Sequence, residues 1–443
     1  MTPYERKEGI EARQSLVHVS RRWRNLVFQS LRRLNLQLFF TPQTARYKLN
    51  VWPAFPLVVK GRVTLSGVDN VVAALERTNR VSKVDLSGGW NQLAKVLAAM
   101  EVPFPELTDL RLSTILKNQA SPPIPMNFLG ESAPNLRILS LDNIFFTEWP
   151  KSLLSATKLV ELHLYHLPYS TCLFPESMIA SLSVMYSLKS LKLNFENCDF
   201  FRRSPSPPKR TTLPALVKFH FEGEIQYLED FVIRIDTPQL IEMHTAFTFF
   251  FSEQSYYNLK CPRLVQFISR TPTFMKSDEA HVLLQNYTIA IALRYSTFKS
   301  TFGDLQIGFQ CMGPVWDLWS IKVCNSLHLL STVEDLYIEN KFPRLHWKNP
   351  TIENDVLLEL FLPFTAVKNL YLSKEFAPAI VAALQVLVGD RLREVLPSLQ
   401  NILLSGLEPS GPFQKNIGQF LTARRLSNHP ISISVRDENS YMK

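Results

Sequence analysis

The histidine pair His163 and His166 is the first place in this sequence where metal chemistry could be sought, because the two residues form the pattern H-x-x-H. The zinc motif H-E-x-x-H has a different spacing, which places both imidazoles on one helix face. Here Leu164 and Tyr165 lie between the histidines, in a segment of alternating apolar residues that is typical of a strand. We therefore interpret both histidines as ordinary strand residues and predict no metal site.

Paired carboxylates are the second candidates for chemistry, because general acid–base catalysis uses such groups in differing environments. Glu229–Asp230 and Asp278–Glu279 are adjacent in sequence, and we interpret them as charged surface residues in loops. The sequence lacks the phosphate-binding patterns G-x-x-x-x-G-K-S/T and G-x-G-x-x-G and the nucleophile pattern G-x-S-x-G. These observations predict a protein that is not an enzyme and that needs no catalytic residue and no cofactor.

The pattern L-x-x-L-x-L dominates the chain, and its clearest copy is Pro134–Asn143. Leu139 and Leu141 alternate with polar residues, so in an extended strand both leucines point to one face while Ser140 and Asp142 point to the other. One strand cannot bury such a face alone. The pattern therefore predicts a stack of similar units.

Copies of this pattern recur almost to the C-terminus. Their apolar residues are Val81, Val84 and Leu86; Leu107, Leu110 and Leu112; Leu159, Leu162 and Leu164; Leu188, Leu191 and Leu193; Leu216, Phe219 and Phe221; Leu240 and Met243; Leu264 and Phe267; Val333, Leu336 and Ile338; Val367, Leu370 and Leu372; Leu399, Ile402 and Leu404. The spacing of roughly 20–29 residues is that of leucine-rich repeats. We predict an α/β leucine-rich-repeat solenoid, with parallel strands on the concave face and irregular helices outside.

The connections between strands carry their own signals. Val68–Glu76 and Asn91–Met100 have the spacing of short amphipathic helices, with Asn91 as a plausible N-cap. A proline precedes several predicted repeat strands, in the pairs Phe104–Pro105, Ala133–Pro134, Leu213–Pro214, Cys261–Pro262 and Leu396–Pro397. The asparagine expected three residues after the last strand leucine is replaced in four repeats by Ile115, Ile144, Leu167 and Glu196. We therefore expect a degenerate array held by apolar stacking.

Two segments depart from the repeat. Thr245–Phe251 is dense in aromatic and β-branched residues, which fits a buried strand or a patch on the concave face. Ala280–Phe309 loses the repeat signature, although parts of it still alternate like strands. This region predicts longer strands or an embedded hairpin.

Composition narrows the class of protein. The chain has 443 residues, of which 46% are hydrophobic and 20% charged, as expected for a folded protein. Its five cysteines are scattered, the charged N-terminus lacks a secretory signal core, and no apolar run is long enough to span a membrane. These features predict an intracellular protein, cytoplasmic or nuclear or both. The net charge of +9 is spread along the chain, so we interpret it as a basic soluble surface and not as a nucleic-acid site.

The segment Ser15–Leu38 has an apolar stripe at helical spacing and a basic opposite side. Its residues Arg21, Arg22, Trp23, Leu26, Ser30 and Leu34 resemble the C-terminal half of an F-box. With Leu38–Pro42, Val51–Pro56 and the C-terminal repeats, the chain from about Ser15 to about Ser434 resembles the F-box-like leucine-rich-repeat proteins of mushroom-forming fungi. Met1–Gln14 contains neither the Leu-Pro-x-Glu-like opening nor the first helix of an F-box.

The resemblance implies partners. The N-terminus would bind the Skp-type adaptor of a cullin ubiquitin ligase, through Leu16, Val19, Trp23, Leu26, Val27 and Leu34. The repeats would hold a protein substrate through exposed strand positions such as Glu161, His163, Ser190 and Lys192. This implies a substrate-recognition subunit divided into a partial F-box at 1–40, a degenerate repeat region at 41–436 and a tail at 437–443.

Two other functions remain open at this point. In the first, the N-terminal helix is only a cap on a repeat scaffold with no ubiquitin role. The second is nucleic-acid binding through the net positive charge. In Phe200–Arg210, Ser204 and Ser206 each precede a proline between basic pairs, which fits phosphorylation, a nuclear signal or a plain linker.

Overall fold

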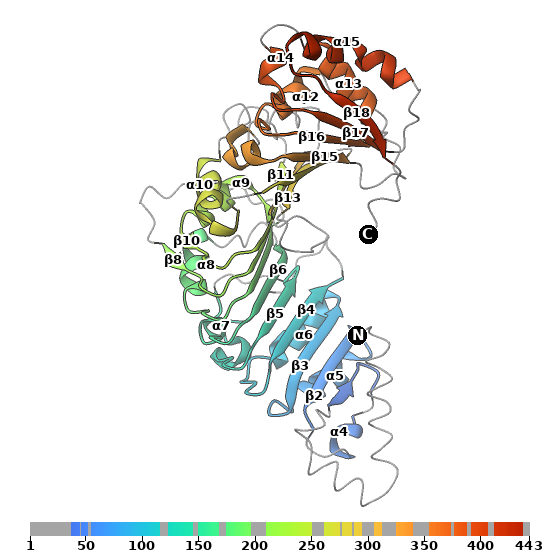
Figure 1. Cartoon of the computed structure of the whole chain (residues 1–443). Coiled ribbons are helices and arrows are strands. Elements are labelled where there is room, and N and C mark those ends of the chain that lie inside the picture. Colours follow the sequence, from blue (N-terminus) through green and yellow to red (C-terminus); the bar gives the residue numbers. More distant parts are fainter. Residues whose placement is uncertain are drawn as a thin grey trace, which may run out of the picture. The chain divides into compact units, whose positions relative to one another are not determined.

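The computed structural model describes residues 37–44, 46–51, 55–115, 123–144, 149–167, 174–195, 210–249, 261–274, 277–285, 288–294, 305–311, 325–339, 354–373, 376–387, 391–405 and 412–436 (Figure 1). The chain divides into two compact units, Met1–Leu188 and Lys189–Lys443. Within the ranges given, none of the helices has the length and apolar character needed to cross a membrane.

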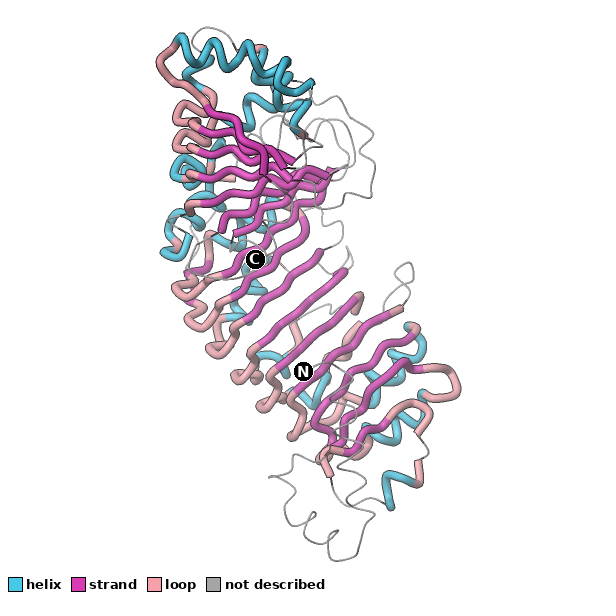
Figure 2. Tube along the Cα trace, turned by 45° about the vertical axis from the view of Figure 1, so that its right-hand side comes forward, coloured by secondary structure: helices cyan, strands magenta, loops and turns pink. Residues whose placement is uncertain are grey.

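The first unit is built on parallel strands that lie side by side in chain order (Figure 2). They are β1 (Leu38–Phe40), β2 (Leu57–Val63), β3 (Val81–Gly88), β4 (Asp109–Thr114), β5 (Ile138–Asp142) and β6 (Glu161–Leu167). Val84, Leu110, Leu139 and Leu162 are aligned across β3 to β6, and none of the four is exposed to solvent. The repeat leucines thus form the predicted apolar face. Burying each one contributes about 1.5–3 kcal/mol.

Short helices connect these strands and cover their apolar face. They are α4 (Lys48–Val51), α5 (Val68–Leu75), α6 (Trp90–Ala99), the 3-10 helix η1 (Phe128–Glu131), α7 (Lys151–Leu154) and α8 (Pro175–Leu182). Helix α5 packs on β2, and α6 packs on β3 through buried Leu93, Val96 and Leu97. Asn91 is not the N-cap. Since β3 ends at Gly88 and the extended Gly89 takes that place, Asn91 lies inside the first turn.

The first unit also contains a polar link that the sequence did not predict. Asn143 follows β5 at a φ of 53°, and its buried side-chain amide donates to Thr114 Oγ1 on β4 at 2.7 Å. Thr114 Oγ1 in turn donates to the Asn143 carbonyl at 3.3 Å. An asparagine tolerates this left-handed backbone better than most residues do. The stacking in this unit is therefore not purely apolar.

In the second unit, the described strands of the main sheet lie in the order β7-β9-β11-β14-β13-β12-β15-β16-β17-β18, and β8 pairs separately with β10. Their bounds are β7 (Ser190–Phe195), β8 (Thr211–Thr212), β9 (Lys218–Gly223), β10 (Ile235–Asp236), β11 (Glu242–Phe249), β12 (Glu279–Gln285), β13 (Thr288–Arg294), β14 (Leu305–Cys311), β15 (Asp335–Glu339), β16 (Asn369–Ser373), β17 (Asn401–Ser405) and β18 (Ser432–Arg436). Strand β13 is antiparallel to β12 and to β14, whereas the other pairs are parallel. The region predicted to hold longer strands or a hairpin does form these three strands.

Helices accompany the second sheet as well. They are α9 (Ile225–Val232), α10 (Pro262–Arg270), η4 (Pro272–Phe274), η5 (His328–Thr332), α12 (Asn354–Phe361), α13 (Ala377–Gln385), α14 (Arg391–Glu394) and α15 (Pro412–Leu426). In β11, Thr245 and Phe247 are buried, which fits the core alternative for the described part of Thr245–Phe251.

The prediction of a repeat strand after Cys261–Pro262 was wrong. Leu264, Phe267 and Ile268 are the buried residues of helix α10, which begins at Pro262. Their spacing at i, i+3 and i+4 is the period of a helix. A proline in the first turn costs no backbone hydrogen bond and favours the same structure.

The interpretation of Glu229–Asp230 as surface charge was also wrong. Both residues lie in α9, and Glu229 is 9% exposed. Its carboxylate accepts hydrogen bonds from the backbone N–H groups of Leu264 at 2.6 Å and Arg263 at 3.1 Å, at the N-terminus of α10. Burial raises the pKa of the Glu229 carboxyl, against the lowering effect of these bonds. Asp230 forms an ion pair with Arg263 beside it. The two carboxylates therefore join α9 to α10.

At the C-terminal end of the second unit, Arg424 of α15 is 2% exposed. Its Nη2 donates to the carbonyls of Val395 at 2.6 Å and Leu396 at 3.0 Å, in the turn before β17. Strand β18 pairs in parallel with β17 as the last strand of the described sheet. Arg424 thus fixes the final helix to the sheet it covers.

Candidate functional site

The strand face opposite the leucines is the candidate functional surface of the first unit. Lys60, Asp85, Arg111, Ser140 and His163 occupy one aligned row across β2 to β6. Lys60 Nζ lies 2.7 Å from Asp85 Oδ2, and both side chains are exposed. Ion pairs of this kind contribute little to stability. The row therefore presents charged and polar groups that remain available to a partner.

Glu161 and His163, two of the predicted substrate-binding residues, lie on this face of β6. His163 Nε2 is 4.0 Å from Glu161 Oε2, and the imidazole is tilted against the Tyr165 ring at 6.0 Å. His166 sits at a φ of 50° with its Nδ1 2.7 Å from Asp142 Oδ1. The H-x-x-H histidines thus have separate carboxylate partners.

Ser190 and Lys192, the other predicted substrate-binding residues, lie on β7 in the second unit, at the positions between buried leucines. Lys192 is aligned with His220 on β9, which is aligned with His244 on β11. The four predicted residues therefore belong to two separate groups, one in each unit.

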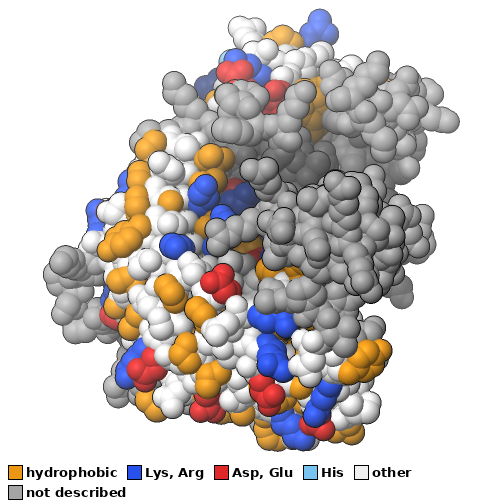
Figure 3. Space-filling view, turned by 90° about the horizontal axis from the view of Figure 1, so that it is seen from below, with side chains coloured by type: hydrophobic (Ala, Val, Ile, Leu, Met, Phe, Trp, Pro, Cys, Tyr) orange, Lys and Arg blue, Asp and Glu red, His pale blue; other side chains and the backbone are white. Residues whose placement is uncertain are grey.

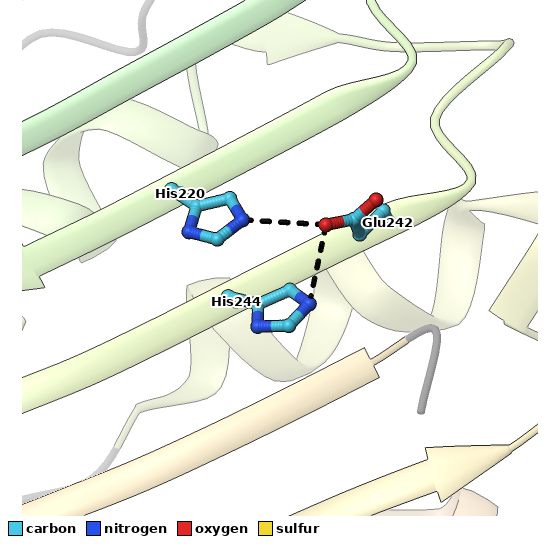
Figure 4. Close-up of side chains that lie close together, drawn as sticks. All are labelled: His220, Glu242 and His244. Atoms are coloured by element: carbon cyan, nitrogen blue, oxygen red, sulfur yellow. Dashed lines mark hydrogen bonds and ion pairs between the residues drawn. The ribbon is translucent and has the colours of Figure 1, made fainter. Parts of the chain in front are cut away.

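His220, Glu242 and His244 form a cluster on β9 and β11 (Figure 4). The Nε2 atoms of both histidines point at Glu242 Oε1, each at 3.4 Å. The two imidazole rings stack at 4.4 Å between centroids and 7° between planes. Lys218 Nζ lies 2.5 Å from the other carboxylate oxygen, Oε2. Side-chain exposures of 34%, 27% and 18% for His220, Glu242 and His244 leave the cluster open to solvent.

The electrostatics of the cluster favour neutral imidazoles beside a charged carboxylate. Burial, followed by the nearby His220, lowers the pKa of His244 to about 4. Burial likewise lowers the pKa of His220, although its hydrogen bond to Glu242 opposes the shift. Burial would raise the pKa of Glu242, but hydrogen bonds from Lys218 and His220 outweigh it and lower the pKa. At neutral pH both imidazoles are uncharged and can use a nitrogen lone pair.

A second group of rings lies on the same strand face further along the second unit. His281, Tyr337 and Tyr371 stack across β12, β15 and β16, with centroids 4.6 Å and 4.0 Å apart. Burial raises the pKa of Tyr337. Beside them runs a row of side-chain hydrogen bonds, in which Asn369 donates to Asp335, Asn401 to Asn369 and Ser432 to Asn401. This part of the face is preorganised by its own side chains.

Sequence reasoning missed the cluster because its members are far apart in the chain. The signal was present as the pattern E-x-H, which occurs on three strands: Glu161–His163, Glu242–His244 and Glu279–His281. Only the strand register shows that a second histidine, His220, lies beside His244. Ser140 occupies the corresponding place beside His163.

Some predicted sites fall outside the described residues. They are the adaptor-binding residues Leu16, Val19, Trp23, Leu26, Val27 and Leu34 and the phosphorylation candidates Ser204 and Ser206. On the face seen in Figure 3, basic and acidic side chains of the described residues are interspersed, with scattered hydrophobic ones among them.

The chain matches no protein-family model and no curated protein. Among solved structures it is similar to the leucine-rich repeat-containing protein LegL7 from Legionella pneumophila, with 14% sequence identity and a TM-score of 0.27, over 89% of this chain and 99% of that chain. A similarity of this size carries no argument.

Proposed function

We propose that this chain is a non-enzymatic protein-interaction module that binds its partner through the exposed strand faces. The observation that carries the proposal is the alternation of buried and less buried residues on the repeat strands β5, β6, β7 and β16. Leucines point inward, while half-buried polar and aromatic side chains point outward in aligned rows. A sheet holds such side chains in fixed positions, so a partner binds without ordering the surface first.

The partner-binding residues in this proposal are Glu161 and His163 in the first unit and Ser190 and Lys192 in the second. A charge reversal, Lys192→Glu, tests the assignment, and Lys95→Glu on the outer side of α6 is the matched control. Proteins bound to the purified chain are compared by quantitative mass spectrometry. Partners lost with Lys192→Glu and retained with Lys95→Glu support the proposal. Partners retained by both variants, or lost equally from both, contradict it.

The finer proposal is a substrate-recognition subunit of an SCF-type cullin ubiquitin ligase. Its support is the F-box-like segment Ser15–Leu38, whose residues Leu16, Val19, Trp23, Leu26, Val27 and Leu34 would contact the Skp-type adaptor. The repeats would then hold the substrate near the ubiquitin-charged enzyme, so that catalysis comes from proximity alone. The alternative is a repeat scaffold without a ubiquitin role, in which Ser15–Leu38 serves as a cap.

Co-purification with the Skp-type adaptor distinguishes the ligase subunit from the scaffold without a ubiquitin role. Trp23→Ala is compared with Trp90→Ala, which changes a tryptophan 40% exposed at the start of α6. A version beginning at Gln37 removes all six adaptor-contact residues but keeps β1, whose Phe40 is fully buried. The ligase role is supported if the intact chain and Trp90→Ala bind the adaptor, whereas Trp23→Ala and the version beginning at Gln37 do not. Folded intact chain that retains no adaptor leaves the scaffold alternative.

A further inference from the structure

The side chains of His220, Glu242 and His244 converge because of where they lie on two neighbouring strands. His220 and His244 face each other across the parallel pair β9 and β11. Glu242 lies on the same face of β11 as His244, because alternate residues of a strand share a face. The sheet therefore fixes three ligand-bearing groups at one place without a loop. Sites held by strands are more precise than sites held by loops.

The distances within the cluster also fit two ligands of one ion. The two Nε2–Oε1 distances are 3.4 Å, longer than the usual length of about 2.7–3.2 Å, so the hydrogen bond between His220 and Glu242 is a long one. Two ligands at about 2.0–2.1 Å from a tetrahedral ion are about 3.3–3.4 Å apart. All three ligand atoms lie within 4.8 Å of one another. Because the two imidazoles are stacked almost parallel, binding of one ion also requires their rings to rotate until the nitrogen lone pairs converge.

Outer contacts hold the ligands in place. Lys218 binds Glu242 Oε2 and leaves Oε1 directed at the imidazoles. The side chain of Gln306 hydrogen-bonds His244 from the neighbouring strand β14. Metal-binding histidines and carboxylates are commonly oriented by such partners. The positive charge of Lys218 lowers the affinity for any cation. Two of the three ligands are imidazole nitrogens, which suit transition metals, whereas calcium and magnesium take oxygen ligands.

We propose that His220, Glu242 and His244 form a binding site for a divalent transition-metal ion of the zinc class. Two imidazole nitrogens and one carboxylate oxygen are ligands that zinc takes in proteins, and three protein ligands leave a coordination position open to water. The site lies on the exposed strand face of the second unit and is independent of adaptor binding by the N-terminal segment.

Zinc titration of the metal-free, full-length chain against a chromogenic chelator tests the proposal. The intact chain is expected to withdraw one equivalent of zinc that His220→Ala, His244→Ala and Glu242→Gln do not. Loss of an outer-contact residue typically weakens metal binding by about 10–100-fold, so loss of a direct ligand should weaken it by at least about a hundredfold. Cobalt(II) provides a second readout, because its visible absorption reports imidazole coordination in the intact chain.

His163→Ala is the matched control, since His163 also lies two residues after a glutamate on a strand, beside Ser140 instead of a histidine. It should bind zinc as tightly as the intact chain. Equal affinity in the intact chain and in folded His244→Ala would overturn the proposal, as would an equal loss in His163→Ala. If His244→Ala does not fold, His244→Gln keeps a polar side chain and replaces it in the comparison.

Discussion

Strands β6 and β11 carry the same pattern, a glutamate and a histidine on one face, yet they form different surfaces. On β6, His163 lies 4.0 Å from Glu161 and its cross-strand neighbour is Ser140. On β11, His244 is joined by His220, and both nitrogens converge on Glu242. The two regions differ on the neighbouring strand, where β9 has His220 and Lys218 at the positions that Ser140 and Ile138 occupy on β5. In a repeat sheet, a site is therefore specified by a row of residues aligned across neighbouring strands and not by a motif within one strand.

A second histidine beside His163 would test whether strand register is enough to form a metal site. Ser140→His places an imidazole beside His163 across β5 and β6, as His220 lies beside His244 across β9 and β11. We expect one additional equivalent of bound zinc, measured by the same chelator competition. Ser140→Ala is the control and should add none. Failure of folded Ser140→His to bind more zinc would show that register alone does not make the site.

The apolar face is common to the two regions, so its disruption should be costly in both. Leu139→Ala in β5 and Met243→Ala in β11 each empty a fully buried position, and a loss of about 2–5 kcal/mol in the free energy of unfolding is expected. Urea denaturation measures it, with exposed Lys95→Ala as control. A loss of stability in only one of the two variants would mean that the buried apolar face stabilises only one of the units.

Each unit has buried polar contacts, and in the second unit Glu229 supplies the contacts that join α9 to α10. Glu229→Gln loses the charge that accepts the Leu264 and Arg263 backbone N–H groups. We expect the free energy of unfolding to fall by about 1–3 kcal/mol. The exposed Glu394→Gln should have no measurable effect. Equal stability of Glu229→Gln and the intact chain would contradict the role of Glu229 in joining α9 to α10.

A further expected effect is a pH dependence specific to the second unit. In the folded chain the pKa of His244 is about 4, whereas an unfolded histidine has a pKa of about 6.5. Below pH about 6.5 the unfolded chain therefore binds more protons, so the free energy of unfolding falls as the pH falls toward 4. The lowered pKa values of His220 and Glu242 act in the same direction. His244→Gln should flatten the profile between pH 6.5 and 4, and an unchanged profile would contradict the assignment.

Much of the fold could be predicted from the sequence, because leucine spacing reports directly on strands that bury one face. Leu110, Leu139, Leu162 and Leu191 are all buried as expected. The antiparallel strand β13 was anticipated only as one of two possibilities, since alternation reveals a strand but not its direction. Leu264 and Phe267 were misassigned because L-x-x-L-like spacing also fits a helix.

The candidate site was harder to predict than the fold. Glu229 looks like any charged helix residue until α10 is seen beside it, and His220 is separated from His244 by a whole repeat. Both depend on which residues become neighbours across elements. Sequence periodicity fixes the face on which a residue lies, and only the register fixes its neighbour.

Anomalous diffraction at the zinc edge, from crystals of the full-length chain grown with zinc, tests most directly whether cross-strand neighbours assemble the site. A peak about 2.0–2.1 Å from His220 Nε2 and His244 Nε2 and bonded to Glu242, with none between Glu161 and His163, is the predicted result. No peak at the His220–Glu242–His244 cluster in zinc-saturated crystals, or an equally strong peak at Glu161 and His163, would contradict it.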